Sequence, residues 1–233
     1  MEIIGGDNEG KSWNSYWIPA IGFNAYDKVM LGAIFHNQTL PKNKLEYTIA
    51  PMFSFGRKNI SGFADINYSW VPAKNIRMIT LGILSKTFGN GLDITTNGGN
   101  PATYITVQPY LDFAIGKPNV RKNYKQRLRL QGHYVTEKGE NIDNSLLGAS
   151  LNYGFKLKKG VHAVNAVLSL DYYDAVNSSN GIVGTLSSEL MNLGVELKYD
   201  LEYWDKKNKS ISIRAFFGQN LFYNGVKLDR YGF

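Results

Sequence analysis

The segment MNLGVELKYDLEYW, residues 191–204, alternates between apolar and polar side chains along its whole length. One parity holds Leu193, Val195, Leu197, Tyr199, Leu201 and Tyr203, and the other holds Asn192, Gly194, Glu196, Lys198, Asp200 and Glu202. Successive side chains of a β-strand point to opposite faces, whereas a helix would scatter both sets around its axis. The segment therefore predicts a strand with one apolar and one charged face. It exceeds the five or six residues of an ordinary strand, and a bilayer crossing needs about 9–11.

The same alternation recurs through most of the chain, with turn-forming residues between the repeats. It covers residues 15–24, 29–37, 45–55, 59–70, 76–86, 103–115, 124–136, 147–157, 164–172 and 210–221, with a weaker candidate at 221–233. The polar stretches 87–102 and 175–185 are expected to be loops. These patterns predict an all-β fold, an antiparallel up-and-down transmembrane β-barrel of about 12 strands. We assign residues 1–12 to a flexible leader and residues 13–233 to the barrel domain.

Composition excludes several classes of protein. The chain has 233 residues and no cysteine, which excludes disulfides, a thiolate nucleophile and a cysteine-based metal site. No apolar run is long enough for a spanning helix. The formal net charge of +7 is dispersed, which argues against a nucleic-acid partner. No signal peptide is visible at the start, so we expect the chain to be part of a longer precursor.

Alternation alone does not separate a membrane barrel from a soluble β-barrel or sandwich. Many repeats keep their pattern over the length that a tilted bilayer crossing needs, and aromatic residues gather near their ends. The charged residues share the polar parity, where an enclosed lumen would hold them: Asp65, Asp112, Arg127, Arg129, Asp171, Glu196, Lys198, Asp200 and Arg214. We predict that these residues form a lumen-facing charge network. A soluble core would instead crowd Leu193, Leu197, Leu151 and Phe113 together.

The links between repeats differ in length and charge. In an up-and-down arrangement the two long links, 87–102 and 175–185, fall at one end. The shorter links at the other end carry much of the basic charge, at Lys42, Lys74, Lys117, Arg121, Lys122, Lys156, Lys158, Lys159, Lys206 and Lys207. Outer-membrane barrels have long extracellular loops and short periplasmic turns, so this count places the N-terminus on the periplasmic side.

The motifs that would indicate catalysis give no convincing site. GGDNEGKS, residues 5–12, matches the phosphate-binding loop in letters but has no convincing strand before it or helix after it. The histidines His36, His133 and His162 lack the spacing of a helical zinc site. His133 and the carboxylates of residues 196–202 are better interpreted as wall residues. We expect no catalytic residue, no cofactor and no metal ion.

Residues 17–70 resemble a known family. The words GFNAYDKVMLG, HNQTLP and KLEYTIAPMFSFGRKNISG are similar to the barrel that follows the catalytic region of outer-membrane-associated M1-type metallopeptidases of Gram-negative bacteria, within the broader Omp85-like surface-antigen group. The resemblance implies a membrane anchor, and no catalytic residue is carried over because H-E-x-x-H is absent.

Three functions follow as expectations. The first is an outer-membrane anchor, with outer-membrane lipid and an upstream enzyme domain of the same polypeptide as partners. The second is a pore or translocation barrel whose inner charges select what passes. The third is a soluble β-barrel that binds a small apolar ligand.

Overall fold

The computed structural model describes residues 14–39, 43–72, 76–90, 102–116, 124–139, 142–159, 162–179, 186–203 and 209–225. These residues form one eleven-stranded sheet in which each strand pairs antiparallel with its neighbours in sequence. The strands are β1 (Tyr16–Asn24), β2 (Lys28–His36), β3 (Leu45–Ser54), β4 (Asn59–Trp70), β5 (Ile76–Asn90), β6 (Ala102–Ile115), β7 (Tyr124–Lys138), β8 (Ile142–Lys159), β9 (His162–Ser179), β10 (Leu186–Tyr203) and β11 (Lys209–Gly225). No helix long and apolar enough to cross a membrane occurs in this part of the chain.

The all-β, up-and-down prediction is confirmed, and a sandwich of two sheets is not, because a single sheet holds every described strand. Closure into a barrel is not found. Within the described residues β1 pairs only with β2, and β11 pairs only with β10. The expected strand at 221–233 is replaced by the end of β11, and residues 226–233 lie outside the described part. The predicted leader, residues 1–12, lies outside it as well.

Both predicted loops include residues that belong to strands. β5 continues through residues 87–90, and β9 continues through residues 175–179. The reason is physical: Asn90 and Ala102 are paired across β5 and β6, and Asn177 pairs with Leu186 across β9 and β10. Backbone pairing in a long antiparallel ladder does not require apolar side chains, so the polar composition of these stretches concealed their strands.

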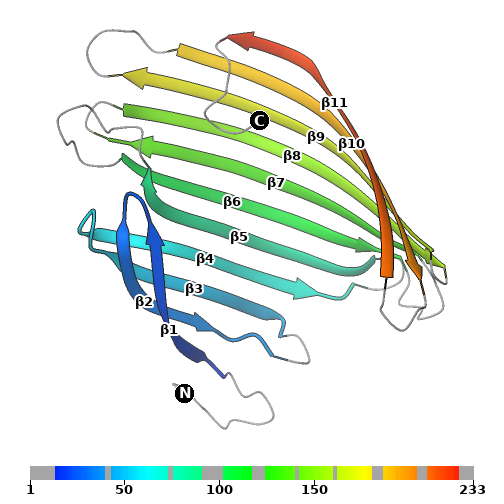
Figure 1. Ribbon diagram of the computed structural model, residues 1–233, viewed down its shortest axis with the longest axis horizontal. Coiled ribbons are helices and arrows are strands. Elements are labelled where there is room, and N and C mark those ends of the chain that lie inside the picture. The colour runs from blue at the N-terminus through cyan, green and yellow to red at the C-terminus, as the bar shows by residue number, and fades with distance from the viewer. Residues whose placement is uncertain are drawn as a thin grey trace.

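The sheet is strongly curved, with the β1–β2 hairpin and the β10–β11 pair at its two margins (Figure 1). Odd-numbered strands run toward the turns at 25–27 and 55–58, which define what we name the tight-turn end. Even-numbered strands run toward the opposite end, where β8 finishes at Lys156, Lys158 and Lys159; we name it the lysine end. β5 ends and β6 begins at the tight-turn end, as do the end of β9 and the start of β10, which agrees with the up-and-down count. Residues 91–101 and 180–185 of the two predicted links lie outside the described part.

Prolines interrupt the ladder at two central strands. The pairing of β2 with β3 passes from Gly32–Met52 to Phe35–Ile49, which leaves out Pro51. That of β6 with β7 passes from Val107–Tyr134 to Tyr110–Gln131 and leaves out Pro109. Proline cannot donate a ladder hydrogen bond, so a central strand accommodates it only at such a break.

Two glycines leave room for a close approach of the backbone beside Pro51. A Cβ atom on Gly32 would lie 2.0 Å from the carbonyl oxygen of Pro51, and one on Gly62 would lie 1.9 Å from that of Ala50. Gly62 also has a φ of 143°, a conformation that side-chain-bearing residues rarely adopt. The local path of β2, β3 and β4 therefore depends on these two glycines.

A buried ion pair joins the two tight turns. Asp27 has no exposed surface, and the Arg57 side chain is 4% exposed. Arg57 Nε donates to Asp27 Oδ1 at 2.6 Å, and its terminal nitrogens donate to Thr103 Oγ1 at 2.9 Å and Ser61 Oγ at 2.7 Å. The backbone N–H of Gly89 donates to Asp27 Oδ2 at 2.6 Å. The pair thus ties the first hairpin to β4, β5 and β6. We name Asp27, Arg57, Ser61, Gly89 and Thr103 the turn lock.

The backbone of the same turns is also joined. Gly56 N–H and the Ser54 hydroxyl both donate to the carbonyl oxygen of Asp27, at 2.8 and 3.0 Å. Asn24 accepts from the backbone N–H groups of Tyr26 and Asp27, which closes the first turn. Asn24 and Ser54 therefore satisfy backbone groups that the two turns would otherwise leave unpaired.

Candidate membrane-facing band and polar concave face

The apolar parity of the sheet is exposed. Residues directly opposite in an antiparallel pair share a face, so the pairing assigns each strand's parity to one side of the sheet. Large apolar side chains on the convex side are 37–80% exposed: Ile21, Phe23, Leu31, Phe53, Ile66, Leu81, Ile83, Leu130, Leu147, Leu151, Leu168, Leu170, Val195, Leu197, Ile213 and Phe217. Leu197 and Leu151, which a soluble core would bury, are 50% and 37% exposed. We name this surface the apolar band.

The band has the height of a hydrocarbon layer. On β9 the convex positions between His162 and Asp174 are Val164, Ala166, Leu168, Leu170 and Tyr172. From His162 to Asp174 the strand rises about 40 Å, which at the tilt of about 40° typical of transmembrane barrels would span about 30 Å. The hydrocarbon core of a bilayer is also about 30 Å thick. His162 and Asp174 on this strand's convex side would thus lie at the two margins of such a layer.

Aromatic pairs border the band at the lysine end. The rings of Tyr124 and Phe155 stack with centroids 6.3 Å apart, and those of Tyr68 and Trp70 are 5.9 Å apart. His162 and Tyr199 also stack, and His162 Nδ1 lies 2.6 Å from the Tyr199 hydroxyl. Rings with an apolar body and a polar tip favour the boundary between hydrocarbon and water, which these positions would occupy.

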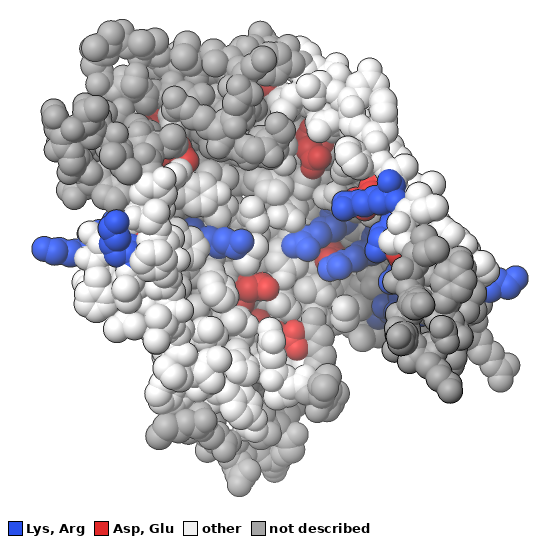
Figure 2. Space-filling model, viewed as in Figure 1, with Lys and Arg blue, Asp and Glu red and all other residues white. Residues whose placement is uncertain are grey.

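The concave side carries the predicted charges. Figure 2 looks into the hollow of the sheet, where acidic and basic side chains both come to the surface. On this side Arg127 donates to both carboxylate oxygens of Asp112, with Nε at 2.7 and 2.6 Å. Asp112 is buried, whereas the Arg127 side chain is 65% exposed. A buried carboxylate is thereby neutralised by a cation that also faces the hollow.

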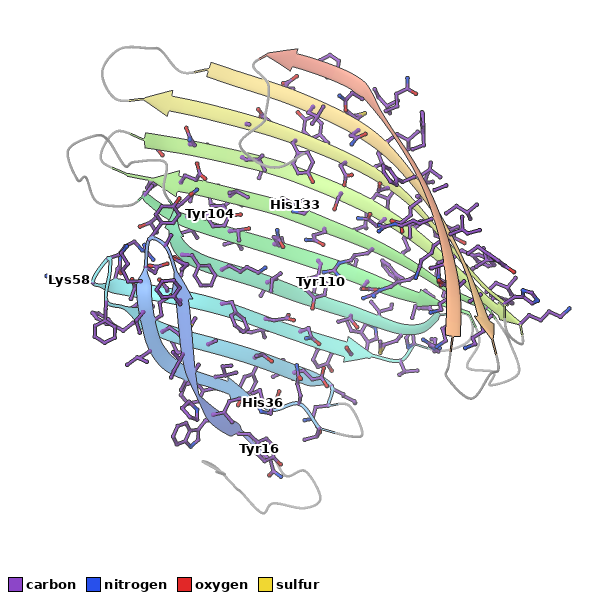
Figure 3. The ribbon with its side chains drawn as sticks, in the orientation of Figure 1. Tyr16, His36, Lys58, Tyr104, Tyr110 and His133 are labelled. Atoms are coloured by element: carbon purple, nitrogen blue, oxygen red, sulfur yellow. The ribbon has the colours of Figure 1, made fainter. Side chains whose placement is uncertain are left out.

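Tyr110 connects this pair to its neighbours (Figure 3). Its hydroxyl donates to Asp65 Oδ1 at 3.2 Å, and the guanidinium carbon of Arg129 lies 4.3 Å from the centre of its ring. Tyr110 therefore contacts a carboxylate through its hydroxyl group and a guanidinium through the face of its ring. The hydroxyl is a hydrogen-bond donor and the ring face is electron-rich, so both contacts are favourable.

His133, also labelled in Figure 3, lies nearer the tight-turn end. Its Nε2 atom is 3.0 Å from Ser150 Oγ, and Tyr173 lies beside its ring at 5.6 Å. Asp171 is directly opposite Ser150. Asn152 also reaches Ser150, at 3.4 Å. These contacts place His133 in a hydrogen-bonded wall, as the sequence predicted.

The remaining predicted charges pair within β10 and between β10 and β11. Arg214 forms a bidentate contact with Glu196, with distances of 2.7 and 2.9 Å. Lys198 Nζ lies 3.1 Å from Asp200, which also accepts a short hydrogen bond from Ser212. The charges thus lie on one face but form separate groups, and no described contact joins the β10–β11 pairs to the Tyr110 group.

Toward the tight-turn end the concave face becomes apolar. Val135, Leu146, Tyr173, Ala175 and Leu190 form a buried cluster, with Leu146 only 1% exposed. Leu146, Tyr173, Ala175 and Leu190 lie just beyond the predicted strands 147–157, 164–172 and 191–204, so the predicted alternation did not extend to them. Side chains at this end are packed against one another, and burial of apolar surface is favoured wherever water is excluded from both faces.

Sequence reasoning missed the turn lock and a second buried carboxylate. Glu137 is 3% exposed and accepts from Asn90 Nδ2 at 2.5 Å and Asn144 Nδ2 at 3.2 Å. The turn lock had an available signal, because Asp27 and Arg57 lie in GFNAYDKVMLG and FSFGRKNISG, parts of the words that carry the family resemblance. Among the described residues no three of histidine, aspartate and glutamate are grouped to hold a metal ion.

No family model matches the chain, and no curated protein or solved structure matches it.

Proposed function

We propose that this chain is a membrane-embedded β-sheet wall of the bacterial outer membrane, and that it anchors an upstream periplasmic or surface enzyme domain. The observation that carries the membrane part is the apolar band. A soluble monomer rarely exposes a contiguous apolar patch beyond a few hundred Å², and larger patches mark contact with a membrane or a partner. Here the exposed apolar side chains extend from β1 to β11.

The anchoring part is supported by the packing of the concave face. A tether needs no water path, so its interior can be filled by its own side chains. The cluster around Leu146 and the turn lock fill the tight-turn end with buried groups. The resemblance of residues 17–70 to the barrels of outer-membrane M1-type metallopeptidases supports an enzyme as the tethered domain.

A pore is the second candidate. The Arg127 and Arg214 side chains are 65% and 61% exposed on the concave side. Cations that face an aqueous path would influence which ions enter it. The anchor and the pore share the membrane-facing band, and they differ in whether the interior conducts.

Two neighbouring residues test the membrane assignment. Leu151 points to the convex side and Asn152 to the concave side of β8. We expect Leu151→Arg to destabilise the protein in lipid by about 2–4 kcal/mol, since a charge would enter hydrocarbon. Asn152→Glu should change stability little, because it adds an anion directly opposite Arg129 on the polar side.

The measurement is reversible unfolding in lipid vesicles, after extraction of the full chain from the membrane fraction with detergent. Equal effects of the two substitutions would contradict the assignment of the faces. Recovery of the chain in the aqueous fraction without detergent would contradict a membrane role and favour the soluble ligand-binding alternative.

A further inference from the structure

The concave face brings two lysines into direct opposition near the lysine end. Lys125 on β7 and Lys156 on β8 are paired in the ladder, on the same face as Arg129. Both lysine side chains are exposed. Directly opposed side chains have Cβ atoms about 5 Å apart, and like charges at such positions destabilise a sheet. An anion bound between the two ammonium groups would relieve this repulsion.

The next pair along the same two strands leaves an open position beside these lysines. Arg127 is directly opposite Gly154, and each lies two residues from one of the lysines. A Cβ atom on Gly154 would have the Arg127 carbonyl oxygen as its nearest neighbour, at 3.9 Å. Neighbours on one face of a strand are about 7 Å apart along it. A small ligand above Gly154 is therefore within reach of the long side chains of Lys125, Lys156 and Arg127.

Positive charge exceeds negative charge around this position. In the described stretches 110–114, 125–129, 152–156 and 165–169 of β6 to β9, the concave side carries one carboxylate, Asp112, and four cations, Lys125, Arg127, Arg129 and Lys156. In Figure 2 basic side chains gather at the right of the hollow, where these strands reach the lysine end. The site thus has an excess of three positive charges.

The neighbouring acids already have basic partners. Asp112 accepts from Arg127, as described above. On β10 Arg214 pairs with Glu196 and Lys198 pairs with Asp200. Within the described part of the chain, no ion pair joins either opposed lysine to a carboxylate. The charge of this lysine pair therefore remains available to a ligand.

Arg129 supplies an independent sign that an acceptor is missing. Its Nε atom is buried and has no hydrogen-bond partner among the described residues. The guanidinium group lies on the Tyr110 ring, which accepts no conventional hydrogen bond from Nε. A buried donor without an acceptor is unfavourable. An oxyanion in this part of the hollow would add both acceptor oxygens and negative charge beside Arg129.

We infer that the concave face above Gly154 is a binding site for a phosphate group, held by Lys125, Lys156 and Arg127. A phosphate group carries nearly two negative charges at neutral pH and three acceptor oxygens. It therefore matches the excess of cations better than a carboxylate, which has one charge and two oxygens. Ammonium and guanidinium groups are the usual phosphate-binding side chains of proteins. The inference goes beyond the proposed function and does not rest on it, because strand pairing alone assigns these residues to one face.

The first test is titration calorimetry of the full chain in detergent, at constant ionic strength, with inorganic phosphate, glycerol phosphate or acetate. We expect both phosphates to bind, and acetate to bind about tenfold more weakly or not at all. K125Q/K156Q should weaken phosphate binding about tenfold or more, because each substitution removes a charged hydrogen bond. The matched variant K28Q/K58Q removes the same charge from the tight-turn end, where Figure 3 labels Lys58, and should bind like the natural chain.

The second test supplies the anion from the chain itself. Gly154→Asp places a carboxylate beside the two lysines, so phosphate binding should be lost while the thermal unfolding midpoint is kept or raised. Gly154→Asn introduces a side chain of nearly the same size without the charge, and it should keep more of the phosphate binding. A retained midpoint in Gly154→Asp shows that its lost binding is not a failure to fold.

The remaining outcomes are equally decisive. Unchanged phosphate affinity in K125Q/K156Q, or an equal loss in K28Q/K58Q, overturns the site. Acetate binding as tight as phosphate binding overturns the assignment of the ligand, and so does equal binding by Gly154→Asp and Gly154→Asn. Binding of inorganic phosphate alone supports the site with the free ion as its ligand, whereas binding of both phosphates supports an ester as well. The membrane role is decided separately by unfolding in lipid vesicles.

Discussion

At the scale of single residues, the turn lock places a full charge pair out of water. Asp27 holds four donors at 2.6–3.0 Å, so removing its charge leaves Arg57 buried without a counter-ion. We expect Asp27→Asn to lower the free energy of unfolding by about 3–5 kcal/mol. Adding Arg57→Gln should restore part of the loss, because no buried charge then remains. Denaturant unfolding in detergent measures both, and a double variant weaker than Asp27→Asn would contradict the ion-pair explanation.

The same carboxylate predicts a dependence on pH. Burial opposes its ionisation, but hydrogen bonds from Gly89 N–H, Arg57 and Asn24 outweigh burial and hold the pKa of Asp27 well below its usual value. A lowered pKa in the folded state stabilises the fold above the unfolded value of about 3.9, and this stability is lost as pH falls below it. Unfolding curves between pH 5 and 2.5 should therefore fall more steeply for the natural chain than for Asp27→Asn. Parallel curves would show that Asp27 is not responsible.

At the scale of the strand, glycines differ in whether a side chain could be added at their position. Gly62 in β4 combines a φ of 143° with a backbone carbonyl at the place of a Cβ atom, whereas Gly218 in β11 has open space there. We expect Gly62→Ala to destabilise by about 2 kcal/mol or more, because the strained backbone and the clash must both be relieved. Gly218→Ala should be neutral or slightly stabilising. Thermal unfolding of the two variants in detergent compares them, and similar midpoints would refute the strained path assigned to β4.

The alternation predicted which face of the sheet each side chain lies on, but it did not predict which side chains from different parts of the chain contact one another. Glu196 and Leu197 lie on the expected opposite sides because the period of a strand is fixed by its backbone. The contact of Asp27 with Arg57 depends on how two separate turns approach each other in space, and a local pattern contains no such information. The apolar cluster around Leu146 on the concave side was also not predicted. An apolar residue in the sequence does not show on which side of a curved sheet it is buried.

At the scale of the whole molecule, the anchor and the pore differ in conduction. We expect the chain, reconstituted in planar bilayers, to conduct poorly, because the tight-turn end of the concave face is packed with buried side chains. If stable ion currents are observed instead, the pore is the better description. In that case Arg127→Gln, which removes an exposed cation, should shift the ion preference toward cations.

The described residues form an odd number of strands, which limits how the two margins of the sheet could pair with each other. In an up-and-down sheet of eleven strands the first and the last run in the same direction. A direct seam between β1 and β11 would therefore be parallel, with slanted hydrogen bonds unlike those of every other pair in the molecule. A closed barrel that is antiparallel throughout requires one additional strand between β1 and β11. Whether this sheet closes into a barrel therefore depends on which segment or partner supplies that strand.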